Sequence, residues 1–301
     1  MDLVVLFHNP EAGNSTHPAA ELVVRVEESG FACHCVSLKD PAWESFDVSA
    51  KVLLVAGGDG SIRAVIGSLI RRVPEGRPPT IGIIPLGTAN NISRTFAIPR
   101  DPERAIDLLR ESTARSLDVG RVEGLSQTDF FVEGMGIGVF PALIRKMDKI
   151  GNPDGPVDER LAIALEMLAD IAQTFEPLSL GIKADGVVYD GDYLLVEVMN
   201  TRSIGPNLVL AGNADPGDGI LDLVLIPAAH RMKLLRHVRA MQNGRPDDFT
   251  YLQISAREII LSVPATWMHV DDEILKCEEG ELNIQVAEGV LNILTPLKRD
   301  R

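Results

Sequence analysis

Residues 57–60 read Gly-Gly-Asp-Gly and follow an apolar run at residues 51–56. Glycine permits the positive φ values and the close backbone approach that a tight turn needs. A helix-like stretch begins at Ser61, and the N-terminus of a helix carries partial positive charge. The segment therefore predicts a turn whose backbone N–H groups bind an anion, with phosphate as the leading candidate. An ordinary strand-to-helix turn is the alternative.

Two further loops have the same character. Residues 9–13 read Asn-Pro-Glu-Ala-Gly and follow a strand-like run at 3–7. Residues 85–91 read Pro-Leu-Gly-Thr-Ala-Asn-Asn and follow a run at 81–84. In an open α/β sheet, ligands bind outside the carboxyl ends of the strands. Three such loops on one edge would form a single phosphate-binding rim.

Acidic residues indicate two more candidate sites. Residues 213–222 place several oxygen ligands, including Asp218, in a tight turn before a strand. Such a turn suits a hard cation, although its spacing is not that of an EF-hand loop. A simple Asp-Gly hairpin turn is the alternative.

The second acidic group is Asp271-Asp272-Glu273, at the end of an apolar run. On a strand, Asp271 and Glu273 would point to one side and Asp272 to the other. Two carboxylates on one side can divide the work, because one can orient a cation-bound water while the other accepts a proton from an attacking hydroxyl. A solvated turn is the alternative.

The composition bounds the class of protein. The 301 residues are 45% hydrophobic and 24% charged, which is typical of a globular protein of about two domains. No apolar stretch reaches the roughly 18 to 20 uncharged residues of a membrane span. The net charge of −14 disfavours nucleic-acid binding, because Lys and Arg make most contacts with a phosphate backbone. A nucleotide that approaches acidic loops needs a cation, and Mg²⁺ would supply it.

The cysteines and the start of the chain indicate a compartment. Three cysteines without Cys-x-x-Cys spacing suit a reducing cytoplasm better than a disulfide framework. The first residues are strand-like and do not form a signal peptide. We therefore expect a cytoplasmic protein whose contact with lipid is peripheral, at the inner membrane surface. No motif distinguishes a monomer from a homodimer.

Strand-like and helix-like segments alternate over the first 115 residues, which predicts a parallel sheet flanked by helices. The expected strands are 3–8, 32–37, 51–56 and 80–84, and the expected helices are 17–29, 61–72, 88–96 and 101–111.

The later sequence predicts a mainly antiparallel β-sandwich, because short β-like runs alternate with Gly and Asp turns from Leu178 onward. The runs are 178–184, 193–199, 221–226, 258–263, 266–270, 281–286 and 290–294. Helices are expected at 141–147 and 158–174. Residues 134–138 read Gly-Met-Gly-Ile-Gly and are expected to form a glycine-rich strand bend. A helical pattern at 231–245 carries Lys and Arg beside an apolar stripe. It either buries one face in the protein or docks on an anionic membrane.

Five ordered motifs resemble the diacylglycerol kinase catalytic-domain family, which includes bacterial lipid kinases and sphingosine kinases. They are Asn9-Pro10-x-x-Gly13, Gly57-Gly58-Asp59-Gly60, Pro85-Leu86-Gly87-Thr88-x-Asn90, Asp218-Gly219-x-Leu221 and Asp271-x-Glu273. The resemblance covers nearly the whole chain. It implies an α/β nucleotide-binding domain at 1–118 with a returning segment at 288–301, a β-rich lipid-substrate domain at 119–287, and a cleft between the two.

The resemblance also implies roles for particular residues. The ATP-binding elements would be Asn9, Pro10, Glu11, Ala12, Gly13, Ser37, Gly57, Gly58, Asp59, Gly60, Ser61, Ile62, Arg63 and Thr88. The Asp218 side chain and the backbone carbonyls of Asp215 and Ile220 resemble the family's magnesium site. Glu273 resembles the family's proton acceptor, oriented near Asp271.

Three residues depart from the family pattern. Ser61 replaces Thr and keeps a hydroxyl, Asn91 replaces Asp, and Asp272 replaces Gly. The change at Asn91 removes a carboxylate that in relatives can join Asp59 in a water and cation network. The change at Asp272 removes a flexible residue beside the expected base.

The resemblance implies an ATP- and Mg²⁺-dependent kinase that phosphorylates the hydroxyl of a diacylglycerol-like lipid. An NAD kinase-like phosphotransferase also uses Gly-Gly-Asp-Gly and is one alternative, although the loop at 85–90 favours the lipid branch. A catalytically silent nucleotide-binding regulator, motivated by Asn91 and Asp272, is the other. No short motif encodes the lipid acceptor.

Overall fold

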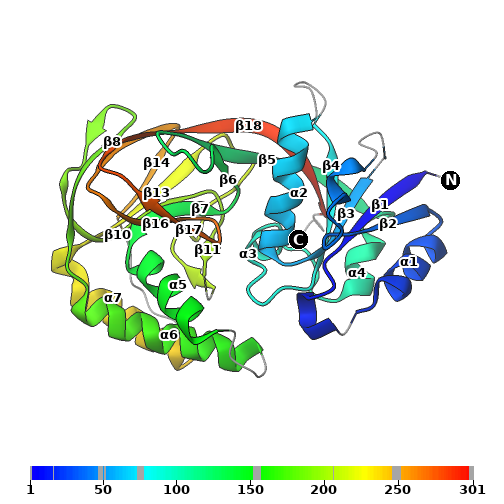
Figure 1. The fold of residues 1–301 in the computed structure, drawn as a ribbon, viewed down its shortest axis with the longest axis horizontal. Coiled ribbons are helices and arrows are strands. Elements are labelled where there is room, and N and C mark those ends of the chain that lie inside the picture. Colours follow the sequence, from blue (N-terminus) through cyan, green and yellow to red (C-terminus); the bar gives the residue numbers. More distant parts are fainter. Residues whose placement is uncertain are drawn as a thin grey trace. The chain divides into compact units, whose positions relative to one another are not determined.

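The computed structural model describes residues 2–15, 17–46, 50, 52–72, 78–151, 157–205, 207–245 and 252–297. The chain divides into two compact units, one formed by Met1–Asp118 with Glu288–Arg301 and the other by Val119–Ala287. Two long strands, β5 (Ser112–Glu123) and β18 (Gly280–Pro296), contain the points at which the chain passes from one unit to the other (Figure 1).

The first unit contains a parallel sheet in the order β2-β1-β3-β4-β18. Its strands are β1 (Leu3–His8), β2 (Ala32–Ser37), β3 (Val52–Gly57), β4 (Thr80–Pro85) and the end of β18, which pairs with β4 at Asn292 and Ile293. Strands β1, β3 and β4 are buried along nearly their whole length, so they consist of continuous apolar runs. The strand order reverses between β1 and β3, which makes this the switch point of the sheet.

Helices cover both faces of this sheet. They are α1 (Ala19–Glu28), α2 (Asp59–Arg72), α3 (Asn91–Thr95) and α4 (Pro102–Asp107), with short 3-10 turns at Ala12–Ser15 and Trp43–Ser45. The connections β1-α1-β2 and β3-α2-β4 run in opposite directions across the sheet, so right-handed crossovers place α1 and α2 on opposite faces. Figure 1 shows α2 on the other side of the strands from α1 and α4.

The second unit is mainly antiparallel. One sheet has the order β17-β16-β7-β10-β13-β14, and β10 also pairs with β8, which continues through β15 to β18. The strands not yet given are β6 (Phe130–Phe131), β7 (Gly134–Gly138), β8 (Leu178–Ala184), β9 (Val187–Val188), β10 (Gly191–Met199), β11 (Ser203–Ile204), β12 (Leu208–Val209), β13 (Leu221–Pro227), β14 (Leu252–Ala256), β15 (Glu258–Val263), β16 (Thr266–Val270) and β17 (Glu273–Cys277).

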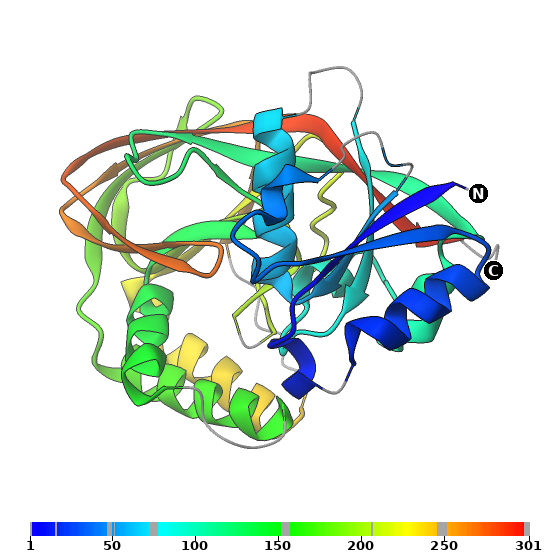
Figure 2. The ribbon, with the colours of Figure 1, turned by 45° about the vertical axis from the view of Figure 1, so that its right-hand side comes forward.

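Two apolar clusters enclose the sheet that contains β7, β10 and β13. Val196 and Val198 of β10 pack toward β8, β15 and β18, which forms the core of the sandwich. Leu195 and Met199 face the other way, toward three helices. These helices are α5 (Val139–Ile150), α6 (Val157–Thr174) and α7 (Arg231–Gln242), and Figures 1 and 2 show α6 and α7 lying side by side. Helix α7 buries an apolar stripe that includes Leu234 and Val238, as expected for a surface helix.

The predicted fold class, an α/β unit followed by a mainly antiparallel β-sandwich, is confirmed. Residues 134–138, expected as a glycine-rich strand bend, form the strand β7. Two local predictions are wrong. The runs at 281–286 and 290–294 form one strand, β18. The helix expected at 88–96 is only Asn91–Thr95, because Asn90 takes a left-handed conformation with φ 54°. None of the helices within the described ranges has the length and apolarity needed to span a bilayer.

Candidate active site

The carboxyl ends of the strands of the first unit lie side by side. His8 of β1 is in register with Ser37 of β2 and with Ala56 of β3, and Gly57 of β3 is in register with Pro85 of β4. The loops that follow these strands therefore gather on one edge of the sheet, on both sides of the switch point. They are residues 37–40, 9–13, 57–60 and 86–90.

Three of these loops are bonded directly to one another. The Asn9 side chain donates from Nδ2 to Ser61 Oγ at 2.9 Å. The backbone N–H of Leu86 donates to the Gly57 carbonyl at 2.9 Å. A Cβ at Gly87 would lie 2.5 Å from the Gly58 Cα, so glycine is required where the two backbones touch. The sequence-predicted rim of glycine-containing loops is thus a bonded unit.

Asp59 connects two of the loops. It is the first residue of α2, and its carboxylate accepts the backbone N–H groups of Asn91 at 3.0 Å and of Ile92 at 3.1 Å. The carboxylate therefore satisfies N–H groups in the first turn of α3, which otherwise have no partner in that helix. Residue 91 makes this contact through its backbone, so the contact does not depend on which side chain stands there.

The remaining sequence-predicted residues of this unit lie around the same rim. Ser37 is exposed at the end of β2, and Lys39 in the next loop pairs with Glu11 at 2.7 Å. Ile62 is completely buried, so only its backbone could face a ligand. Pro10, Ala12, Gly13, Gly60, Arg63 and Thr88 are half-buried.

In the second unit, the structure corrects the prediction that Asp271 and Glu273 share one side of a strand. Asp271 and Asp272 form the two-residue turn between β16 and β17, and exposed Glu273 begins β17. Asp271 is 5% exposed and has φ 54°. Its carboxylate accepts backbone N–H groups from residues 132–134, with the shortest distance, 2.7 Å, to Glu133. Asp271 therefore fixes the turn from which Glu273 extends.

The loop expected to bind magnesium is a compact turn. The Asp215 carbonyl accepts N–H groups from Gly217 at 2.7 Å and Asp218 at 3.2 Å, and Asp218 Oδ1 accepts the Ile220 N–H at 3.1 Å. The groups that could bind a metal here are all oxygens, the type of ligand that Mg²⁺ and Ca²⁺ prefer. Within the described ranges, no three His, Cys, Asp or Glu side chains form a metal-binding group.

This loop and the Asp271 turn lie at the same end of one sheet. Asp222, just after the loop, is in register with Met199, which is in register with Gly134 beside Asp271. The loop precedes β13 and the turn follows β16, three strand spacings away, or about 14 Å. The sequence-predicted residues of this unit thus occupy two separate places.

Sequence analysis did not single out two completely buried ionisable side chains, Glu197 and His269, whose Oε2 and Nε2 atoms lie 2.8 Å apart. Burial raises the pKa of Glu197, and the contact with His269 only partly offsets this. Burial lowers the pKa of His269, but the Glu197 carboxylate and the Asp271 contacts outweigh burial and raise it overall. The sequence signal that could have identified the pair is Glu197, the one acidic residue in the otherwise apolar run at 193–199 of β10.

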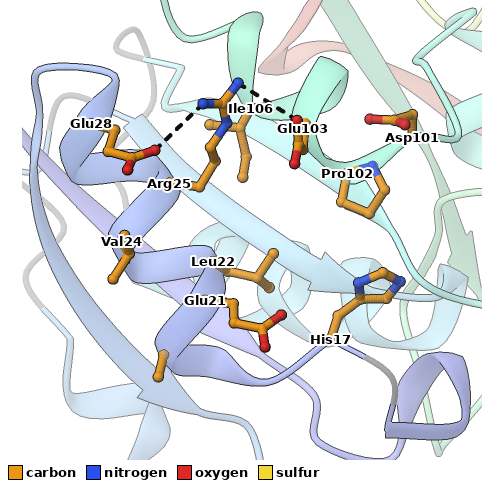
Figure 3. Close-up of a pocket in the computed structure, with 11 residues that line it drawn as sticks. His17, Glu21, Leu22, Val24, Arg25, Glu28, Asp101, Pro102, Glu103 and Ile106 are labelled. Atoms are coloured by element: carbon orange, nitrogen blue, oxygen red, sulfur yellow. Dashed lines mark hydrogen bonds and ion pairs between the residues drawn. The ribbon is translucent and has the colours of Figure 1, made fainter.

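A cavity of about 590 Å³ in the first unit lies between α1 and α4 (Figure 3). Its lining includes Glu21, Glu28, Asp101 and Glu103, and Arg25 reaches Glu28 at 3.4 Å and Glu103 at 3.8 Å. Because carboxylates outnumber cations here, the cavity is poorly suited to phosphate.

Two family models match the chain. Residues 3–122 match the model of the diacylglycerol kinase catalytic domain, and residues 154–294 match that of the YegS C-terminal NAD kinase beta sandwich-like domain. The chain is 29% identical over 245 residues to a diacylglycerol kinase of Bacillus subtilis, covering 77% of this chain and 76% of the relative. It is 29% identical over 307 residues to a probable YegS-like lipid kinase of Pseudomonas aeruginosa, covering 98% and 94%.

Solved structures show the same fold. A putative diacylglycerol kinase from Bacillus anthracis has a TM-score of 0.77 at 20% identity and covers 99% of this chain and 98% of that chain. An NAD kinase from Archaeoglobus fulgidus, in complex with ATP, has a TM-score of 0.54 at 13% identity and covers 99% and 95%. At these identities the likeness concerns the fold alone.

The buried pair gives a pH prediction. His269 faces Glu197 from β10, the Asp271 carbonyl and the Phe140 ring of α5. Above pH 6.5, the ordinary pKa of histidine, the unfolded chain releases the imidazole proton while the folded pair retains it. The free energy of unfolding should therefore fall as pH rises, by at most about 1.4 kcal/mol per pH unit from this pair.

The measurement is urea unfolding at pH 6.5, 7.5 and 8.5 for the wild type and for Glu197→Gln. In the variant, the free energy of unfolding should lack the part of its pH dependence that comes from this pair, because a buried His269 without an anionic neighbour stays neutral. Parallel curves for the two proteins would contradict the assignment.

Proposed function

We propose that this chain, whose residues 3–122 match the diacylglycerol kinase catalytic domain, is an ATP-dependent lipid kinase that transfers the γ-phosphate of ATP to the hydroxyl of a diacylglycerol-like acceptor. The observation that carries the proposal is the set of bonded, glycine-containing loops at the switch point of the first unit's sheet. Backbone N–H groups and the start of a helix at such an edge are suited to phosphate.

In this proposal the first unit, residues 1–118 with 288–301, is the nucleotide-binding domain. The backbone of residues 9–13, 57–63 and 87–88 lies against the phosphates, with Ser37 at the margin. Asn9 and Asp59 act through the loops that they hold, and Arg63 adds positive charge. The second unit, residues 119–287, is the lipid-substrate domain.

Magnesium has two places in the proposal. An ion bound with ATP would supply positive charge that offsets the charge of the phosphates. The Asp218 side chain, with the carbonyls of Asp215 and Ile220, would hold a second ion. Because its loop lies about 14 Å along the sheet from the Asp271 turn, we assign that position a structural role.

Glu273 is the proposed general base. The lipid hydroxyl oxygen forms a bond to the γ-phosphorus, the bond from that phosphorus to the oxygen of the ADP leaving group breaks, and the hydroxyl proton passes to the Glu273 carboxylate. Asp271 positions this base through the turn. Positioning and charge stabilisation supply most of the rate in phosphoryl transfer.

Asp59 and Asp101 form a matched pair for testing the nucleotide site. Both carboxylates accept backbone N–H groups at the start of a helix. Asp59 caps α3 in this way, and Asp101 caps α4 by accepting the Arg104 N–H at 3.0 Å. Replacement by Ala should cost each protein about 0.5–2 kcal/mol of stability. Only Asp59→Ala should weaken ATP binding, at least about tenfold, because only that cap holds the phosphate loops. Equal ATP dissociation constants in calorimetric titrations of the two variants would count against the site.

The base assignment is tested with Glu273→Gln. We expect kcat to fall about 10²- to 10⁴-fold with the ATP dissociation constant unchanged, because a general base contributes that much to the rate. Asp272→Asn is the control, since it removes the adjacent exposed carboxylate and should leave turnover within a few-fold. Equal losses in the two variants, or full activity of Glu273→Gln, would refute the role.

The assay of wild-type turnover separates the alternatives. Labelled ATP is offered with a lipid panel and, in parallel, with NAD. Label in lipid alone supports the proposal, whereas label in NADP would support an NAD kinase-like enzyme. Tight ATP binding without transfer to any acceptor would support the silent regulator.

We infer peripheral contact with an anionic lipid surface through α7. Its 12 residues include no Asp or Glu although the chain has a net charge of −14. Lys233, Arg236 and Arg239 are exposed on one side of the helix, and Met232 beside them is 71% exposed. Basic side chains with an exposed apolar residue suit such a surface.

Changing Lys233, Arg236 and Arg239 together to Gln should lower the affinity for phosphatidylglycerol vesicles, measured by co-sedimentation, at least about tenfold. Each basic residue near the surface contributes about 1 kcal/mol to the free energy of binding. The control changes Arg104, Arg110 and Lys276 to Gln, with the same loss of charge elsewhere. An equal effect of both triple variants would indicate net charge rather than a docking face.

A further inference from the structure

Glu197 and His269 are buried under α5 on the helix-facing side of the sheet. Glu197 alternates with Val196 and Val198, which face the sandwich core, and the His269 ring contacts Phe140 of α5 with centroids 6.3 Å apart. Both side chains have 0% exposure, and Glu197 Oε1 has no hydrogen-bond partner among the described residues. A buried ion pair is often replaceable by apolar residues without loss of stability. Its place in the fold therefore needs another explanation.

The pair bridges a whole strand. Glu197 of β10 and His269 of β16 are both in register with Gly136 of β7, which lies between them. Their backbones are two strand spacings apart, about 10 Å, so each side chain must reach over the central strand. A Cβ at Gly136 would overlap the Glu197 carboxylate, and only glycine leaves room for the contact. The glycine-rich character of β7 thus has a specific purpose at this position.

The other side of the imidazole ring binds the turn before Glu273. His269 Nδ1 lies 2.9 Å from the Asp271 carbonyl. A carbonyl oxygen only accepts, so Nδ1 carries a proton. A second proton lies between His269 Nε2 and Glu197 Oε2. The hydrogen bonds at the two ring nitrogens together fix the orientation of the ring.

The turn is therefore held at two points. The Asp271 carboxylate binds the N–H groups of residues 132–134, and the Asp271 carbonyl accepts from His269. We propose that Glu197 and His269 are positioning residues for Glu273, acting through the Asp271 turn across Gly136. The inference rests on the proposed function, since it assigns a purpose to the orientation of the proposed base.

The test compares two replacements of His269 in a Glu197→Gln background, which avoids leaving an unpaired buried charge. Glu197→Gln alone is the reference for both double variants, because neutral His269 can still donate from Nδ1 and accept the Gln amide at Nε2. Adding His269→Asn keeps a donor where Nδ1 stood. Adding His269→Gln instead keeps a donor where Nε2 stood and loses the contact with the turn.

We expect Glu197→Gln/His269→Gln to lower kcat about 100-fold, the scale of a misplacement of about 1 Å, with an unchanged ATP dissociation constant. Glu197→Gln/His269→Asn should recover most of that loss. Val196→Ala, on the sandwich side of the same strand, controls for stability. The positioning role is overturned if the Asn and Gln double variants lose kcat equally. It is also overturned if Val196→Ala lowers kcat as much as the His269→Gln double variant does at an equal loss of melting temperature.

A second measurement does not need activity. Amide hydrogen exchange of residues 271–273 should be at least about tenfold faster in the His269→Gln double variant than in the His269→Asn double variant. Equal exchange would overturn the inference. A wild type that phosphorylates no lipid would instead refute the proposed function, and the exchange result would still decide whether His269 holds the turn.

Discussion

The candidate site depends on two carboxylates, Asp59 and Asp271, that each accept several backbone N–H groups. Asp271 is buried and binds three consecutive N–H groups, and Asp59 binds two at the start of α3. Hydrogen bonds to ionised acceptors are stronger than neutral ones, and a buried carboxylate without them is costly. Each carboxylate therefore forces a distant segment of chain into place, and the residues proposed to touch substrate extend from the segments so fixed.

The same view explains two departures from the family pattern. Residue 91 contacts Asp59 through its backbone N–H, so Asn is compatible with this role. In the turn between β16 and β17, the positive φ falls on Asp271 and not on Asp272. Position 272 therefore has no conformational need for glycine. The backbone contact of residue 91 and the conformation of residue 272 are therefore compatible with the side chains present.

Much of the site was predictable because its signals are local. Glycine-containing loops after buried strands predicted the set of loops that the structure brings to one edge of the sheet, and continuous apolar runs predicted the parallel sheet. The Glu197–His269 pair was not predictable, because it depends on register: two residues 72 positions apart meet only when β7 separates their strands and Gly136 stands between them. The Asp271 turn was misassigned for a similar reason, since a turn and a strand of acidic residues have the same local composition.

The most direct test of the account is the backbone amide spectrum of the isotope-labelled protein during titration with ATP and Mg²⁺. If glycine-lined backbone holds the phosphates, the largest shifts will occur at amides of residues 9, 11–13, 57–63 and 86–88. Shifts concentrated instead at the acidic cavity between α1 and α4, around Glu21 and Arg25, with the three loops unchanged, would contradict it.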